Sequence, residues 1–368
     1  MAEATAQAPE KRRITKQLRS NLITYAIVVG AYVILQALIA TGNLSNALTG
    51  QLIPICAYVC MAVSLNLVVG ISGELSLGHA GFMSVGAFSG VTVASMLHSS
   101  VANPIVVLII SLVVGAIVAG VVGFVVGIPV MRLHGDYLAI VTLAFGEIIK
   151  NILNSIYVGF DASGLHFSMT DTASLNMTRG TIIINGAQGA AGIAKVSTFT
   201  VGIILVLVTV TVVLNLMNSR SGRAIMAVRD NRIAAESVGV NVTKYRLMAF
   251  VVAAALAGMA GAFYAQGFSS IVPKKFDFNL SILVLVFVVL GGMGNIRGSV
   301  ISAALLTVLP ELLRAINDWR MMIYAVLLIV VTIAANNATA RQFFSSLKGK
   351  FRKPVREDGA KGGDADGR

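Results

Sequence analysis

The stretch SRSGRAIMAVRDNRIAAESVGVNVTKYR, residues 219–246, decides how the chain is organised, because long apolar segments lie on both sides of it. It carries six Lys or Arg side chains and two acids. Membrane-protein loops rich in Lys and Arg stay in the cytoplasm. Asp230 or Asn231 can cap a short helix that Gly239 can end. The stretch therefore predicts a cytoplasmic loop that presents a helix of about eight residues, about 12 Å long, to a partner.

The composition is that of a polytopic membrane protein. Of the 368 residues, 56% are hydrophobic and only 12% are charged, and the mean hydropathy is +0.84. The net charge of +12 does not indicate nucleic-acid binding, because 19 of the 28 Lys and Arg lie in three stretches that flank apolar runs. Such clustering favours interaction with membrane lipid headgroups and sets topology. We expect a lipid environment and no nucleic-acid partner.

Ten segments read as membrane helices, since roughly 20 apolar residues cross a bilayer as a helix. They cover about 22–40, 52–71, 74–97, 104–131, 136–158, 197–218, 247–268, 279–292, 298–316 and 320–335. Segment 74–97 is rich in Gly and Ser and segment 279–292 is short, so either could be broken or re-entrant. We expect an all-α membrane protein with about 10 spans, in the range 8–10.

The same count predicts the domain organisation. Residues 1–21 form a basic cytoplasmic N-terminus, 22–335 the transmembrane domain, and 336–368 a basic, disordered cytoplasmic tail. Both termini and the loop 219–246 lie in the cytoplasm, and segment 159–196 lies outside.

The glycine-rich stretch GISGELSLGHAGFMSVG, residues 70–86, interrupts the apolar pattern. Irregular backbone at membrane depth is tolerated where it lines a cavity or is buried in protein, and small residues let helices pack closely. Two interpretations stay open: a pathway lining, or close packing with a tight turn that holds Glu74 near the interface. The candidates for the pathway in this stretch are Gly73, Ser76, Gly78 and His79.

The stretch RLHGDYLAIVTLAFGEIIK, residues 132–150, predicts a turn followed by a membrane helix. Gly135 and Asp136 form the turn, and Asp136 can cap the helix. Glu147 lies about 16 Å along that helix, near the middle of the bilayer, where ionisable groups are costly and usually functional. It is a further pathway candidate. The alternatives are a local pair with Lys150, three residues on, or a protonated, uncharged Glu147.

The stretch LGGMGNIRGS, residues 290–299, predicts a tight turn built on Gly291, Gly292 and Gly294. It is not a dinucleotide fingerprint, because Arg297 stands where the third glycine belongs and no strand precedes it. The sequence contains no G-x-x-x-x-G-K-[ST] phosphate loop and no catalytic or metal-ligand constellation. We expect no catalytic residue, metal or cofactor. Cys56 and Cys60 are interpreted as packing residues.

Four stretches carry a family resemblance. They are GISGELSLGHAGFMSVGAFSG (70–90), RLHGDYLAIVTLAFGEIIKNIL (132–153), GRAIMAVRDNRIAAESVGVNVTKYRLMAFVVAAALAGMAGAFYA (222–265) and VVLGGMGNIRGSV (288–300). In this order and spacing the chain resembles the LivM-type membrane subunit of ABC importers for branched-chain amino acids, over most of residues 50–332. The resemblance implies a type II ABC importer permease fold in the bacterial inner membrane. It also implies that the chain transports rather than catalyses.

The resemblance also implies partners: two ATP-binding subunits, a second, LivH-like permease subunit, an extracytoplasmic substrate-binding protein and an amino-acid substrate. In the family the loop before a Gly- and Ala-rich span contains a coupling helix that docks on the ATPase, with a Glu-Ala-Ala-x-x-x-Gly pattern. Ile233 stands at the glutamate position of that pattern here. The candidate coupling residues are Arg223, Arg229, Asp230, Arg232, Ala234, Ala235, Glu236 and Gly239.

Alternatives to this function stay open. Urea and short-amide importers have similar membrane subunits. An ion-driven secondary transporter with Glu147 as proton carrier is compatible with the glycine breaks. A receptor or scaffold would use the basic loop for docking.

Overall fold

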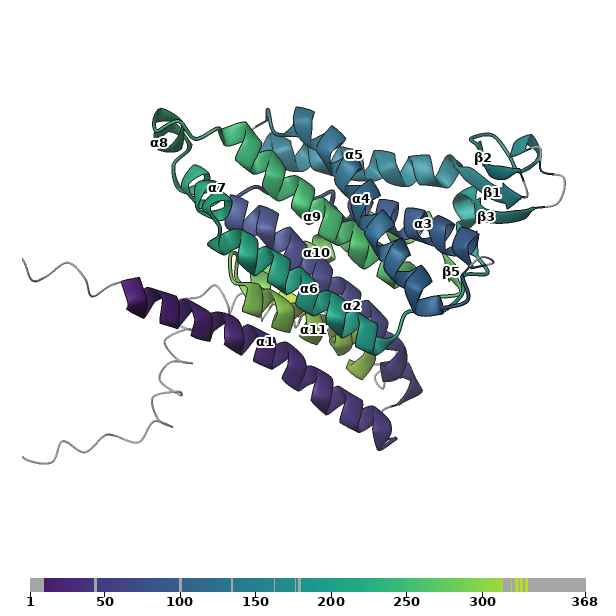
Figure 1. Ribbon diagram of the computed structural model, residues 1–368, viewed down its shortest axis with the longest axis horizontal. Helices are drawn as coiled ribbons and strands as arrows, with labels where there is room; N and C mark the ends of the chain where they lie inside the picture. Colours follow the sequence, from purple (N-terminus) through teal and green to yellow (C-terminus); the bar gives the residue numbers. More distant parts are fainter. Residues whose placement is uncertain are drawn as a thin grey trace, which may run out of the picture. The chain divides into compact units, whose positions relative to one another are not determined.

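The computed structural model describes residues 10–42, 45–98, 101–133, 135–161, 163–175, 177 and 180–313, with a few positions between 319 and 329. The chain divides into two compact units, Met1–Ala315 and Ile316–Arg368. All elements below belong to the first unit (Figure 1).

Among the described residues, seven helices are long and apolar enough to cross a membrane. They are α1 (Glu10–Ala40), α2 (Asn46–Asn66, continued by a π-helix, Leu67–Ser72), α3 (His79–Leu97), α4 (Pro104–Val130), α5 (Asp136–Ser155), α6 (Phe199–Asn218) and α9 (Val242–Ala265). This confirms the prediction of a polytopic helical membrane protein. Four further helices are α7 (Arg220–Asp230), α8 (Arg232–Ser237), α10 (Phe278–Gly291) and α11 (Ile296–Leu312).

Helix α9 lies at the centre and packs against α4, α3 and α2. Glycines make these contacts possible. A Cβ added to Gly86 of α3 would lie 2.0 Å from the carbonyl oxygen of Gly258 in α9, and one added to Gly261 would lie 1.9 Å from that of Met83. Small residues at these positions let the helix backbones approach one another closely, as is common in membrane proteins.

The predicted span 74–97 is wrong at its start. The π-helix ends at Ser72, and the next residue, Gly73, has a left-handed backbone (φ +76°). Residues 74–78 are not helical, and α3 begins at His79. The backbone turns at Gly73 because only glycine adopts positive φ at little cost.

Other boundaries differ by smaller amounts. Helix α9 begins five residues before the predicted position 247, because Asn241 caps it by accepting a hydrogen bond from the Lys244 backbone N–H (3.0 Å). Arg246 therefore belongs to the helix rather than to the loop. Helix α10 has only 14 residues, as its short apolar segment predicts. The predicted segment 320–335 lies mostly outside the described residues. Cys56 and Cys60 are buried and unpaired, which confirms a packing role.

The segment after α5 folds into a small antiparallel sheet, which an all-α expectation did not include. Its strands are β1 (Tyr157–Asp161), β2 (Gly164–Ser168), β3 (Thr181–Asn185), β4 (Ala190–Ala191) and β5 (Ser270–Ile271), in the order β2-β1-β3-β4-β5. Val158 pairs with Phe167 across the first hairpin, and Ala190 with Ile271 across the last pair. Strand β5 thus ties the segment after α9 to the sheet.

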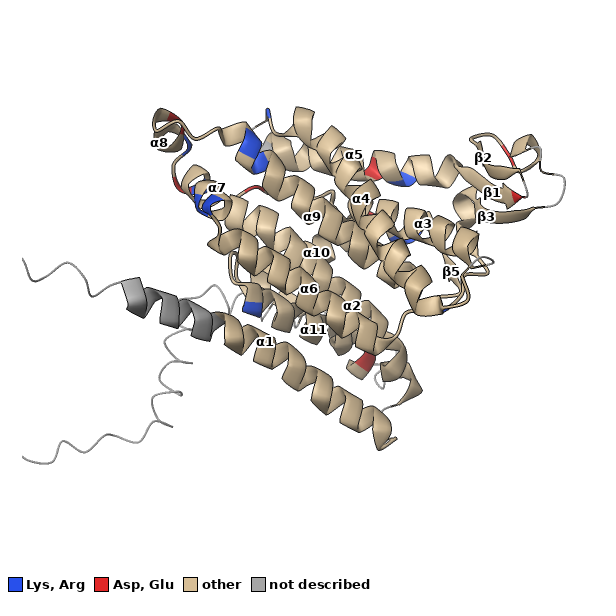
Figure 2. Ribbon diagram, in the orientation of Figure 1, with Lys and Arg blue, Asp and Glu red and all other residues tan. Residues whose placement is uncertain are grey.

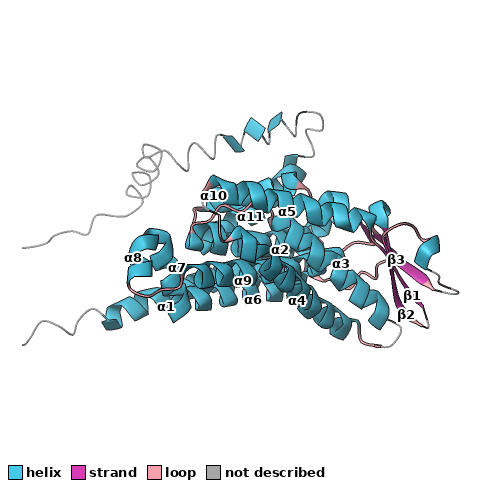
Figure 3. Cartoon of the chain, turned by 90° about the horizontal axis from the view of Figure 1, so that it is seen from above, coloured by secondary structure: helices cyan, strands magenta, loops and turns pink. Residues whose placement is uncertain are grey.

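The membrane helices run between two ends of the first unit that differ in structure. We call the end that carries α7 and α8 the loop end, and the end that carries the strands the sheet end; they lie at opposite ends of the helices (Figures 1 and 3). Lys and Arg gather on α7 and at the start of α9 (Figure 2). The basic charge predicted for residues 219–246 is therefore concentrated at the loop end.

Candidate functional site at the loop end

Residues 219–241 fold into two short helices. Asn231 caps α8 by accepting a hydrogen bond from the Ala234 N–H (3.0 Å). At its other end Gly239 has φ +84°, and the Val240 N–H donates to the Ala235 carbonyl oxygen (3.0 Å). This confirms the predicted cap and the predicted stop. The helix has six residues rather than eight, and α7 precedes it.

A small hydrophobic cluster holds the loop against the start of α9. It consists of Val228, Ala235 and Val242, with Val240 packed against it. Ala234 and Ala235 therefore differ: Ala235 is buried in this cluster, whereas Ala234 is exposed. Two large apolar side chains on or beside α8 face outward, Ile233 with 80% and Val238 with 78% of its surface exposed. Glu236 and Gly239 are also exposed.

Arg229 links α7 to the end of α2. Its Nη1 donates to the Gly70 carbonyl oxygen (3.0 Å), and its Nε and Nη2 donate to Asp230 Oδ1 at 3.0 and 2.8 Å. A Cβ at Gly73 would lie 2.5 Å from Arg229 Cγ, so this glycine makes room for the arginine. Arg223 instead donates to the nearby Asn218 carbonyl oxygen (3.2 Å).

A buried ion pair joins α9 to the segment after α2. Arg246 Nε donates to Glu74 Oε1, and both side chains are less than 10% exposed. Arg246 Nη1 also donates to the Met131 carbonyl oxygen at 3.2 Å. Sequence reasoning missed this pair, although an acid next to an apolar segment demands a cation. The second oxygen of Glu74 has no hydrogen-bond partner among the described residues.

The end of α2 also contacts the turn between α10 and α11. Asn66 Oδ1 accepts a hydrogen bond from the Gly294 N–H (2.8 Å), and Asn66 Nδ2 donates to Ser299 Oγ (2.8 Å). Gly292 and Gly294 have positive φ, and Gly291 ends α10, which confirms the predicted tight turn. We call residues 66–74 the α2 junction, since α7, α9 and α11 all bind to it.

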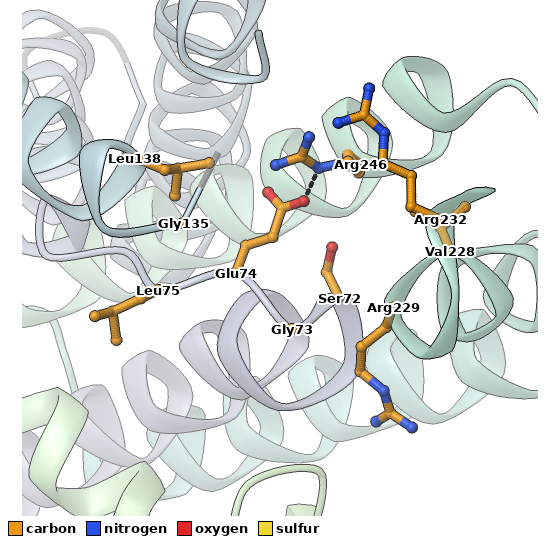
Figure 4. A pocket seen from close by; sticks show the side chains of 10 residues that line it. All are labelled: Ser72, Gly73, Glu74, Leu75, Gly135, Leu138, Val228, Arg229, Arg232 and Arg246. Carbon is orange, nitrogen blue, oxygen red and sulfur yellow. Dashed lines mark hydrogen bonds and ion pairs between the residues drawn. The ribbon is translucent and has the colours of Figure 1, made fainter. Parts of the chain in front are cut away.

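A cavity of about 340 Å³ opens between α7, α8 and the α2 junction, and we call it the loop-end cavity (Figure 4). Three arginines, Arg229, Arg232 and Arg246, and one acid, Glu74, line it. Figure 4 shows the Glu74 carboxylate beside the Arg246 guanidinium, while Arg229 turns to the opposite side. The lining of the cavity also includes three apolar side chains, Leu75, Leu138 and Val228, and two glycines, Gly73 and Gly135.

The other pathway candidates near α3 are packed inside the chain. His79 is 1% exposed, and its Nε2 lies 2.8 Å from Ser64 Oγ. Ser76 is fully buried. A Cβ at Gly78 would lie 2.1 Å from the Thr142 carbonyl oxygen of α5. This geometry fits the close-packing alternative in the single chain, and a pathway role for these residues stays a prediction.

Helix α5 carries the remaining candidates. Glu147 forms an ion pair with Lys150, and their side chains are 36% and 18% exposed. This is the local pair that the sequence left as an alternative. Gly135 precedes the helix with φ +59°. The helix begins at Asp136 itself, so the prediction that Asp136 caps it is wrong by one position.

Comparison with known proteins agrees with the family resemblance. A family model described as "Branched-chain amino acid transport system / permease component" matches residues 47–332. The chain is 35% identical over 293 residues to the high-affinity branched-chain amino acid transport system permease protein LivM of Salmonella typhimurium, covering 75% of this chain and 66% of that protein. The values for LivM of Escherichia coli are 35% over 295 residues, with the same coverages.

A second type of relative is more distant. The probable branched-chain amino acid transport permease protein LivH of Methanocaldococcus jannaschii is 28% identical over 172 residues, covering 46% of each chain. The matched part of this chain covers about two thirds of the length of the two LivM proteins named above. No solved structure matches the chain.

Proposed function

This chain belongs to the family of branched-chain amino acid transport system permease components, and on that premise we propose that it is the permease subunit of an ATP-driven importer for branched-chain amino acids. The family match over residues 47–332 carries the proposal. The sequence has no phosphate loop of its own. Hydrolysis of ATP therefore belongs to two separate ATP-binding subunits, and substrate capture to an extracytoplasmic binding protein.

The loop end faces the cytoplasm in this proposal, because basic residues gather there and such residues resist translocation. The exposed Ile233 and Val238 then present apolar surface to an ATP-binding subunit. Removing such apolar surface from water stabilises a contact with a partner. Since Arg229 of α7 bonds to the α2 junction, movement of α7 and α8 is passed to the end of α2 in this proposal, and Arg246 ties the start of α9 to the same junction.

A second permease subunit covers α5 in this proposal. Tyr137, Ile140 and Ile148 form an exposed stripe on that helix, and the Glu147–Lys150 pair is partly exposed beside it. A charged pair at membrane depth usually faces protein or a water-filled cavity rather than lipid. The similarity to LivH proteins supports pairing of two related subunits, with the pathway between them.

The test is reconstitution with and without partners. We expect leucine uptake into proteoliposomes only when the second permease, the ATP-binding subunits, ATP and the binding protein are all present. Uptake by this chain alone under a proton gradient would instead support the ion-driven transporter with Glu147 as carrier.

Docking of α8 is tested at Ile233. The variant Ile233→Asp should lose co-purification with the ATP-binding subunit and lose uptake, because it places a charge in an apolar contact. The matched variant Ile233→Leu should keep both. Co-purification of Ile233→Asp at the wild-type level would exclude this face of α8 as the docking surface.

A further inference from the structure

An open groove runs along the contact between α4 and the first three turns of α9, two helices that lie side by side (Figure 1). Its volume is about 560 Å³. One residue of α4 and seven residues from the start of α9 line it: Phe124, Asn241, Thr243, Lys244, Leu247, Met248, Val251 and Val252. We call it the α4–α9 groove. None of these residues lines the loop-end cavity or belongs to the α2 junction.

The lining changes character along α9. At the loop end of the groove, Asn241, Thr243 and Lys244 are polar and exposed, whereas every lining residue beyond them is apolar. From Lys244 to Val252 the helix rises about 12 Å, close to the roughly 15 Å that one leaflet contributes to the hydrocarbon core of a bilayer. An acyl chain can therefore follow the apolar part of the groove through most of a leaflet while its headgroup lies at the polar end.

The polar end attracts negative charge. Lys244 is the one charged residue that lines the groove, and no ion pair joins it to the described part of the chain. It lies in the first turn of a 24-residue helix, whose N-terminus carries positive potential. The Asn241 side-chain oxygen already accepts from the Lys244 backbone N–H, so the Asn241 amide nitrogen and the Thr243 hydroxyl can donate to an anion.

We propose that the α4–α9 groove binds an anionic phospholipid, with the phosphate at Lys244 and one acyl chain along Leu247, Met248 and Val251. Basic residues at the end of a membrane span attract anionic headgroups. A soluble anion would leave the apolar part of the groove unused, and the cation of a zwitterionic headgroup would find no acid in the lining. The inference requires only that the chain lies in a membrane, so it does not rest on the proposed transport function.

The type of side chain favours lipid over a helix of another subunit as the occupant. Within this chain α9 packs against α4 and α3 through small residues, since Gly258 meets Gly115, and Gly86 meets Gly258. Helix contacts in membranes favour such residues. The membrane part of the groove is instead lined by Phe, Leu, Met and Val side chains. Val121 and Val125, near Phe124 on α4, are 57% and 61% exposed, as a lipid-facing surface requires.

Photolabelling tests the proposal. The assembled transporter is reconstituted into phosphatidylcholine liposomes with a trace of a lipid that carries a diazirine on its acyl chain, and the labelled peptides are identified by mass spectrometry. Two probes with the same acyl chain are compared, phosphatidylglycerol and phosphatidylcholine. We expect both to label residues 247–252 of α9, and phosphatidylglycerol to give about fivefold more label, as one lysine near the membrane surface predicts.

Variants of Lys244 test the headgroup contact. Lys244→Gln should make the two probes label α9 about equally, and Lys244→Arg should restore the preference because it keeps the charge. Lys244 is exposed, so these changes leave the core intact. Arg220→Gln is the matched control, since it removes an exposed positive charge from α7 outside the groove, and it should keep the wild-type preference.

A second pair of variants tests the acyl-chain contact. Val252→Trp fills part of the groove and should lower the labelling of α9 by both probes. Val113→Trp places the same side chain on α4 outside the groove, at a position that is 51% exposed, and should leave the labelling unchanged.

Four outcomes would overturn the proposal. They are equal labelling of the wild type by the two probes, an unchanged preference in Lys244→Gln, no label in the groove while other helices are labelled, and loss of the phosphatidylglycerol label on addition of inorganic phosphate. The third would show that another subunit covers the groove, and the fourth that it selects soluble anions. Leucine uptake is measured on the same preparation, and its absence would contradict the proposed function without changing the labelling result.

Discussion

The loop end and the β1–β2 hairpin of the sheet end hold their polar side chains together in opposite ways. At the loop end, Arg246 and Glu74 are 172 positions apart in sequence, and Arg229 and Gly70 are 159 apart. At the sheet end, Asp161 binds Ser163 and His166, two and five positions away. Long-range pairs connect helices to one another, whereas local pairs only shape one hairpin. The long-range pairs support the proposal that the loop end passes movement to the membrane helices, whereas the local pairs hold the shape of the β1–β2 hairpin.

The comparison predicts the largest effect for the buried ion pair. Replacing Arg246 by Ala leaves Glu74 buried without a cation, and we expect a loss of about 3 to 5 kcal/mol in stability. Thermal unfolding in detergent measures this. The double variant Glu74→Gln with Arg246→Met should be less destabilised than Arg246→Ala, because neither charge is left alone. A double variant worse than the single one would contradict a pairing role.

A smaller effect is expected at Gly73. The substitution Gly73→Ala forces a Cβ into left-handed backbone, and against Arg229 Cγ, so we expect a loss of about 1 to 2 kcal/mol. Gly30→Ala is the matched control, because its Cβ would meet no atom within 4 Å. Equal unfolding temperatures for the two variants would show that the α2 junction is not tightly constrained.

The smallest effect is expected at the sheet end. Hydrogen bonds from the Ser163 side chain and backbone lower the pKa of the Asp161 carboxyl. A lowered pKa means that the carboxylate stabilises the hairpin above its ordinary pKa of about 3.9 and that this contribution is lost as the pH falls through the folded-state pKa. Hydrogen exchange, corrected for its intrinsic pH dependence, should therefore accelerate in residues 161–166 at low pH. The β3–β4 pair, in which Ile184 lies opposite Ala190, should not change, and parallel acceleration there would contradict a local role for Asp161.

Local signals in the sequence predicted local structure well. Asn231 and Gly239 delimit α8 because a cap and a left-handed stop act within a few residues. The glycine turn before α11 was predictable for the same reason. Asn241 is likewise a residue type that favours the N-cap position and so marks the start of α9. The basic residues Lys244 and Arg246 nevertheless led to the prediction that the first turn of this helix belongs to the loop.

Structure that depends on distant partners was not predictable from one sequence. Nothing near Glu74 in sequence points to Arg246. Strand β5 is only two residues long and pairs with β4, which lies about 80 positions away. The packing of His79 against Ser64 likewise appears only once α2 and α3 are placed side by side. The sequence therefore predicted the loop as a candidate site but did not predict that the loop is bonded to the α2 junction.

We propose that the loop passes movement to the membrane helices through the α2 junction, and the variant Arg229→Met tests this most directly. This variant keeps the apolar stem but removes the hydrogen bond to Gly70. ATP hydrolysis and leucine uptake are measured in the same proteoliposomes of the assembled transporter, with Arg220→Met as the control, because Arg220 is exposed on the same helix and is not among the candidate coupling residues. We predict that Arg229→Met keeps ATP hydrolysis and loses most uptake, while the control keeps both. If Arg229→Met transports as much leucine per ATP hydrolysed as the wild type does, the proposal is contradicted.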